Sequence, residues 1–346
     1  MAENPYRSLS ARSFWRAAVS DVHYSDLSEL WTPMTLSRGD RIATAGSCFA
    51  QHIGNNLANR GANFLDLEPP PPSIFSSLSE ARRFGYRVYS CRYGNIYTSR
   101  QLLQLFEEAF GRRSPASVVW TRGNRYFDAL RPSVDPVGQD SADVVNTLRE
   151  KHLARVREMF LSLDVFVFTM GLTEGWESQV DHTMYPTAPG TICGSFNPTE
   201  YAFHNLSYPE ILDDMSSFWN LLKQVNKQAR LLLTVSPVPL TATASGEHVL
   251  VATTYSKSTL RAVAGDLSQT HQDIFYFLSY EIISSHPSRG MFYDHNLRTV
   301  NKSGVDHVMR HFFSGKIASA FEVTGTPEHS EEQELICDEE AQDEST

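Results

Sequence analysis

A serine and a cysteine stand side by side where a strand is predicted to give way to a helix. Residues 41–46 have the composition of a short buried strand, and apolar residues recur at helical spacing from Phe49 to Leu57. Ser47 and Cys48 therefore lie at a helix N-terminus, where backbone N–H groups and the helix dipole can stabilise an oxyanion or lower a thiol pKa. Nucleophilic catalysis is the chemistry that such a turn can support. Two simpler alternatives stay open: Ser47 is only an N-cap, or Cys48 is only a buried packing residue.

The rest of the chain alternates predicted strands with amphipathic helices, which indicates an α/β fold with a helix-covered, parallel sheet. Ligands of such sheets bind beyond the carboxyl ends of the strands. The segments that leave strand ends carry small or polar residues, which makes them candidate site segments. The long segment 171–205 has no sustained period, which favours an ordered active-site loop or a lid. Further strands are expected at 164–169, 230–235 and 274–278, and helices at 99–110, 142–160, 209–227, 255–267 and 303–313.

Composition sets further limits. The chain has 346 residues and is 41% hydrophobic, enough for a sizeable core, and no apolar run approaches the roughly 20 residues that span a bilayer. The N-terminus lacks the apolar core of a signal peptide, so we expect a cytoplasmic protein.

The four cysteines of the chain form no CxxC pair, which argues against a zinc or disulfide framework. The net charge of −10 is concentrated after Pro327, where nine acidic residues and no Lys or Arg occur, so the body offers no basic surface for nucleic acid.

The segment Gly46–Ala50 reads Gly-Ser-Cys-Phe-Ala, the signature of the GSCFA family, and the chain resembles that family over roughly residues 10–320. Five later blocks support the resemblance: 169–176, 185–191, 234–239, 255–261 and 279–282. The family looks related to SGNH/GDSL-like hydrolases. The resemblance implies a three-layer α/β/α sandwich with a mostly parallel sheet, SGNH-hydrolase or flavodoxin-like, with insertions. We expect one domain over 1–325, with an N-terminal arm over 1–40, and a disordered acidic tail over 326–346.

The resemblance also assigns roles. It implies that Ser47 is the nucleophile and that Gly46 and the Cys48 N–H form part of the oxyanion site, together with Gly171. Where those hydrolases have an Asn donor, this chain has Thr173 and Glu174. We also expect Ser236 and Lys257 to contact the substrate, with Arg261 beside Glu174 and Lys257 in a charged pocket floor.

The proton acceptor is the point at which the chain departs from its relatives. Where they show Asp-x-x-His before the last helix, this chain reads Asn-Leu-Arg-Thr-Val over 296–300. His295, oriented by Asp294, is the first substitute base. His248 is the rival and His204 a third choice, while His307 lies inside the predicted last helix.

These residues predict an SGNH-like acyl-ester hydrolase or O-acyltransferase that forms a Ser47 acyl-enzyme. The expected substrate is a small-molecule or saccharide-linked acyl ester. The missing Asp-x-x-His motivates one alternative, a catalytically degenerate protein that binds a glycan, an acyl ligand or a protein partner. A Cys48 thiol enzyme that uses a coenzyme A thioester is the other. Neither HExxH nor GxxxxGKS occurs, and no GxGxxG follows a strand, so we expect no metal, nucleotide or other cofactor.

Overall fold

The computed structural model describes residues 4–314, 317 and 321. Its central sheet has four parallel strands in the order β1-β4-β8-β9: β1 (Ile42–Gly46), β4 (Val165–Met170), β8 (Arg230–Val235) and β9 (Ile274–Phe277). Phe64 adds a parallel bridge to Ile42 on the side of β1 that faces away from β4. After β1 the chain therefore continues on one side of that strand, at Phe64, and its next central strand, β4, lies on the other side. This reversal places the topological switch point at the carboxyl ends of β1 and β4.

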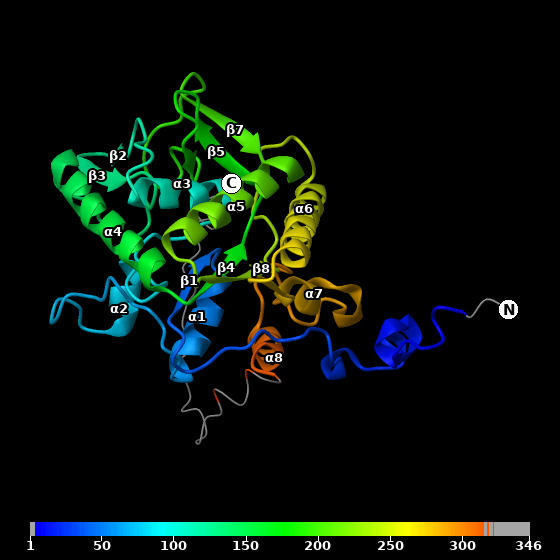
Figure 1. Cartoon of the computed structure of the whole chain (residues 1–346). Coiled ribbons are helices and arrows are strands. Elements are labelled where there is room, and N and C mark those ends of the chain that lie inside the picture. The colour runs from blue at the N-terminus through cyan, green and yellow to red at the C-terminus, as the bar shows by residue number, and fades with distance from the viewer. Residues whose placement is uncertain (1–3, 315–316, 318–320, 322–346) are drawn as a thin grey trace.

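Helices cover both faces of this sheet (Figure 1). Alternate residues of β4 show the two layers, because Phe166 and Phe168 belong to one apolar cluster and Val165 and Val167 to another. The first cluster is completed by α3 (Ser99–Ala109), α4 (Ala142–Ser162), α5 (Tyr208–Val225) and α6 (Val249–Thr270). The second is completed by α1 (Ala50–Asn59), α7 (Ser279–Ser284) and α8 (Lys302–Phe312). The predicted α/β/α architecture with a parallel sheet is confirmed.

Two small antiparallel sheets extend the core fold. The strands β5 (Glu174–Ser178), β6 (Met184–Tyr185) and β7 (Tyr201–Asn205) form one, in the order β6-β5-β7, and β2 (Val119–Arg122) and β3 (Arg125–Asp128) form a hairpin. Figure 1 shows β5 and β7 at the opposite end of the molecule from α8. The segment 171–205, for which an ordered active-site loop or a lid was expected, contains these three strands. Most residues of β5 and β7 are half-buried, so the two strands lack the alternation by which a strand is predicted.

The other predicted strands and helices are present, with ends shifted by a few residues, except that α6 begins at Val249 and not at 255. A short helix, α2 (Leu78–Arg83), was not predicted, nor was α7. Three 3₁₀ turns (11–13, 24–26 and 286–288) and one π-helical turn (16–20) complete the described elements. Within the described part of the chain, every helix is too short or too polar to span a bilayer.

The N-terminal arm has two parts. Tyr6 and Trp15 are largely exposed, and Figure 1 shows this part (dark blue) running away from the sheet. From Trp31 onward the arm packs on α8: the Trp31 indole N–H donates to the His311 carbonyl at 2.9 Å, and Met34 is buried in the same apolar cluster as α8. The predicted acidic tail, 326–346, lies outside the described residues.

Candidate active site

The turn after β1 is held tightly by backbone contacts. Gly46 has φ +135°, a conformation that favours glycine, and a Cβ there would collide with the backbone of Thr169 on β4. The Ser47 N–H donates to the Thr169 carbonyl at 3.1 Å, and the Ile96 N–H donates to the Gly46 carbonyl at 2.9 Å. The glycine is therefore required for the chain to pass this close to β4 before it enters α1.

Ser47 is enclosed but does not cap the helix. It is 3% exposed, and its Oγ has no hydrogen-bond partner among the residues that the structure describes. The N-cap of α1 is Phe49, and no side chain caps that helix. The alternative reading of Ser47 as a simple N-cap is therefore wrong.

Cys48 packs in the apolar cluster of α1 and α8, at 4% exposure. This is the ordinary environment of a buried free cysteine. Its backbone N–H stays the proposed oxyanion donor because it follows the serine at the start of the turn.

Gly171 approaches the serine closely. A Cβ on Gly171 would lie 3.0 Å from Ser47 Cβ and 3.1 Å from the Tyr97 ring. The N–H groups of Gly171 and Leu172 both donate to the Tyr97 carbonyl, at 2.9 and 3.0 Å. The expectation that the Gly171 N–H holds an oxyanion is not supported, because this donor is engaged. The residue instead allows β4 and the serine turn to come together.

Two hydrogen bonds from helix α6 hold the loop that follows β4 in place. Lys257 is 1% exposed and donates from Nζ to the Gly171 carbonyl at 2.6 Å, while Ser256 Oγ accepts the Thr173 N–H at 3.0 Å. Thr173 Oγ1 donates to Asn205 Oδ1 at 2.7 Å, which ties the same loop to β7. Lys257 and Thr173 therefore position the segment that faces Ser47.

The remaining predicted binding residues separate into three places. Ser236, at the end of β8, is 1% exposed, and its N–H donates to the Met170 carbonyl at 2.9 Å. Glu174 is 8% exposed, and its Oε1 accepts the Thr243 hydroxyl at 2.8 Å. Arg261 forms an ion pair with Glu281 of α7, so the expectation that it shares a pocket floor with Glu174 was wrong.

His295 and Asp294 lie in a surface loop at the carboxyl edge of the sheet. The loop packs on the segment leaving β8, because the Tyr293 hydroxyl donates to the Pro237 carbonyl at 2.8 Å and Arg298 Nε donates to the Pro239 carbonyl at 3.2 Å. Both side chains are exposed. Within the described residues, no hydrogen bond joins them to each other or to Ser47, so the expected Asp294–His295 orientation is not formed in this structure.

The other three histidines have structural partners. His248 is exposed and is the N-cap of α6, with Nδ1 accepting the Leu250 N–H at 3.2 Å. His204 pairs through its two ring nitrogens with Glu177 and Glu210. His307 stacks on Phe292, and burial, helped by His311 and Arg310, lowers its pKa to about 4.

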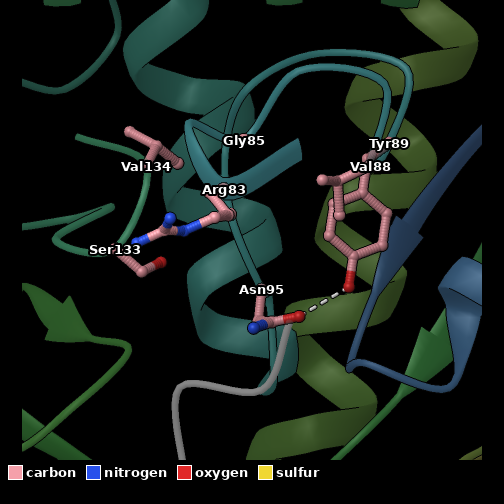
Figure 2. A pocket seen from close by; sticks show the side chains of 8 residues that line it. Arg83, Gly85, Val88, Tyr89, Asn95, Ser133 and Val134 are labelled. Carbon is pink, nitrogen blue, oxygen red and sulfur yellow. Dashed lines mark hydrogen bonds between the residues drawn. The ribbon is translucent and has the colours of Figure 1, made fainter. Parts of the chain in front are cut away.

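The segment 89–97, which crosses the serine turn, was not predicted to belong to the site. The Tyr89 hydroxyl lies 3.0 Å from the Ser47 carbonyl and 2.6 Å from Asn95 Oδ1 (Figure 2), and Gln51 Nε2 donates to the same hydroxyl at 3.4 Å. The run Tyr-Gly-Asn-Ile-Tyr over 93–97, just before a capping box at Thr98, could have signalled it. The structure thus brings an asparagine to the turn, though not from the segment after β4 where one was expected.

Two cavities lie near these residues. The first, beside Tyr89 and Asn95 (Figure 2), has a volume of about 10 Å³, which is the size of one water molecule. The second has a volume of about 270 Å³ and lies between β5, β7 and the segment after β8. Its wall includes Leu172, the residue after Gly171. Of these two cavities, the second is the one large enough for an organic substrate.

No cluster of three or more His, Cys, Asp or Glu residues suited to a metal ion occurs in the part of the chain that the structure describes. The structure places a serine turn at the switch point of a parallel sheet covered by helices on both faces, which makes the chain a protein of the α/β/α class. The GSCFA family model matches residues 41–312, so the chain belongs to the GSCFA family. A comparison with curated proteins finds no match.

Proposed function

We propose that the protein is an SGNH-like acyl-ester hydrolase or O-acyltransferase that acts on saccharide-linked acyl groups through Ser47. One observation carries the proposal. The backbone of Ser47 is held at its N–H by Thr169 and approached at its carbonyl by Tyr89, while its Oγ makes no hydrogen bond to a described residue. A fixed backbone with an uncommitted hydroxyl at the sheet's switch point suits a nucleophile better than a structural serine.

The proposed chemistry has two steps. Ser47 Oγ attacks the ester carbonyl and loses its proton to a base, and the Cys48 N–H in the turn before α1 stabilises the oxyanion. The tetrahedral intermediate then expels the alcohol, which takes that proton and leaves an acyl-serine. Water completes hydrolysis, whereas a second hydroxyl completes transfer.

The proposed base is His295, because its loop packs on the segment leaving β8 at the same edge of the sheet. His248 is the second candidate, and its use would cost α6 its cap. Since Ser47 is 3% exposed and neither imidazole bonds to it, an ester reaches Oγ only after a neighbouring segment moves.

Turnover of p-nitrophenyl acetate tests the proposal. Ser47→Ala should lower kcat at least about 10³-fold, because the nucleophile is lost. Ser288→Ala is the control, a buried serine outside the proposed site whose hydroxyl donates only to backbone carbonyls, so its loss should leave turnover in place. Undiminished turnover in pure, folded Ser47→Ala protein contradicts the proposal.

A second candidate function is binding without catalysis. The observation that favours it is the absence of any imidazole hydrogen bond to Ser47 Oγ within the described residues. In that case wild-type and Ser47→Ala proteins bind the same ligand and neither turns over esters.

The remaining alternative is a Cys48 thiol enzyme. It predicts that iodoacetamide inactivates the protein and that Cys48→Ser loses activity, while Ser47→Ala stays active.

A further inference from the structure

The 270 Å³ cavity has walls from three parts of the fold. Leu172, Glu174 and Trp176 come from the loop after β4 and from β5, and Phe203 comes from β7. The opposite wall is the run 240–244, which follows β8. Two of these walls therefore grow from the carboxyl ends of central strands, where ligands of such sheets bind.

Two aromatic residues, Trp176 and Phe203, line the cavity. The Trp176 ring meets Phe203 edge-on, with ring centroids 5.9 Å apart, and meets Phe196 edge-on at 5.1 Å. Trp176 and Phe203 are only half-buried. A half-exposed aromatic ring held by its neighbours offers a flat apolar face to a ligand.

Hydroxyl groups and one carboxylate form the polar part of the wall. Thr187, Thr191, Thr241 and Thr243 all line the cavity, together with Glu174. Thr187 is 2% exposed, and its Oγ1 has no hydrogen-bond partner among the described residues. Thr191 Oγ1 donates to the Ala188 carbonyl at 2.7 Å and Thr243 Oγ1 donates to Glu174, so these two hydroxyls are left as acceptors for ligand hydroxyls.

The charges of the lining residues restrict the class of ligand further. Among the described residues, no Lys, Arg or His lines the cavity, and Glu174 does. An anionic ligand would find no cationic side chain among these lining residues and would lie beside the Glu174 carboxylate. The volume lies just below the range of about 300–1,000 Å³ that drug-sized ligands occupy, which fits a single substituted ring.

We infer that this cavity binds one neutral sugar ring, with the apolar face of the ring on Trp176 and its hydroxyls on Glu174 and the threonines. The inference rests on the proposed function, since it names the group that carries the acyl ester. It predicts that the acyl substituent points from the cavity past Leu172 toward Gly171 and Ser47.

Calorimetric titration with neutral methyl pyranosides tests the inference, in the full chain carrying Ser47→Ala. We expect weak binding of at least one methyl pyranoside, and Trp176→Ala and Glu174→Gln should each raise its Kd at least about tenfold, since each removes a contact worth about 1.4 kcal/mol. Trp176→Phe should recover part of the affinity because it keeps an aromatic face. Trp15→Ala, in the exposed N-terminal arm, should have no effect.

Three results would overturn the inference: no pyranoside binding at high millimolar concentration, affinities unchanged in both cavity variants, or preferential binding of tetramethylammonium or a uronic acid. Because binding is measured without turnover, the two proposals fail separately. Ester turnover that depends on Ser47, without sugar binding, overturns only the sugar site. Sugar binding with turnover that survives Ser47→Ala overturns only the proposed mechanism.

Discussion

At the residue scale, Ser47 combines a fixed backbone with a hydroxyl that makes no hydrogen bond to a described residue. Its neighbours explain this arrangement: Gly46 permits the turn, Gly171 permits close approach, and Tyr89 reaches the Ser47 carbonyl. A buried hydroxyl without a partner lowers the stability of the fold, and such a cost is commonly found at functional sites.

Ser47→Ala should therefore leave the protein as stable as the wild type or slightly more stable. The Ser47 Oγ makes no hydrogen bond to a described residue. The free energy of unfolding of Ser47→Ala should therefore lie between about 0.5 kcal/mol below and about 1 kcal/mol above that of the wild type. Urea unfolding of both proteins measures the difference. A loss of more than about 2 kcal/mol would mean that the hydroxyl is bonded in the folded protein.

Gly171→Ala should be destabilising by about 1–3 kcal/mol and should also impair turnover, because the new Cβ lies 3.0 Å from Ser47 Cβ and displaces it. Gly39→Ala is the control, since the nearest atom to a Cβ there is 3.9 Å away. Thermal unfolding and p-nitrophenyl acetate turnover give the two readouts. Equal stability of the two variants would show that the loop after β4 does not press on the serine.

At the element scale, buried ion pairs join the hairpin β2–β3 to the helices of the first cluster. Arg149 of α4 pairs with Asp128 at the end of β3 and with Glu108 of α3, and all three side chains are about 5% exposed. Asp128 pairs also with Arg131. Burial opposes ionisation of Asp128, yet Arg149 and Arg131 hold its pKa at about 2.

Arg149→Met should lower the free energy of unfolding by about 3–5 kcal/mol, because it leaves two buried carboxylates with one fewer cation. Arg155→Met changes an exposed ion pair on the same helix and should cost less than about 1 kcal/mol. Denaturant titration of both variants measures the two losses in the free energy of unfolding. Similar costs for the two would show that the network is not what ties β3 to α3 and α4.

The strands of the central sheet could be predicted because they are continuous apolar runs, and most helices because their apolar residues recur with the helical period. The strands β5 and β7 could not be predicted, since half-buried residues such as Trp176 and Phe203 erase the alternation of a two-faced strand. Ser47, Gly46 and Gly171 were placed together correctly by the strand-end argument. The roles of Tyr89, Asn95 and Tyr97 depend on contacts across the turn, which local patterns do not encode.

At the scale of the whole molecule, three histidines are held neutral in the folded state. Burial and the nearby Arg82 lower the pKa of His52 to about 4, and its enclosed Nε2 has no hydrogen-bond partner among the described residues. Burial is also the main cause that lowers the pKa of His152 and that of His307 to about 4. An unfolded histidine has a pKa of about 6.5.

Stability should therefore fall as the pH falls from about 6.5 to about 4, because the unfolded chain takes up protons that the folded chain excludes. Each such histidine contributes up to about 1.4 kcal/mol per pH unit. His52→Gln should make the slope between pH 5 and 6.5 shallower by about 1 kcal/mol per unit, and His295→Gln, which alters an exposed imidazole, is the control. An unchanged slope in His52→Gln would show that this imidazole is protonated in the folded protein.

Fluorophosphonate labelling with mass-spectrometric mapping shows whether Ser47 is an activated nucleophile, since the reagent modifies a serine only when a base activates it and amide donors hold the adduct. We predict a single adduct on Ser47, lost in Ser47→Ala and reduced in His295→Ala. Folded wild-type protein that stays unlabelled, or that carries the adduct on another residue, would show that Ser47 is not the nucleophile.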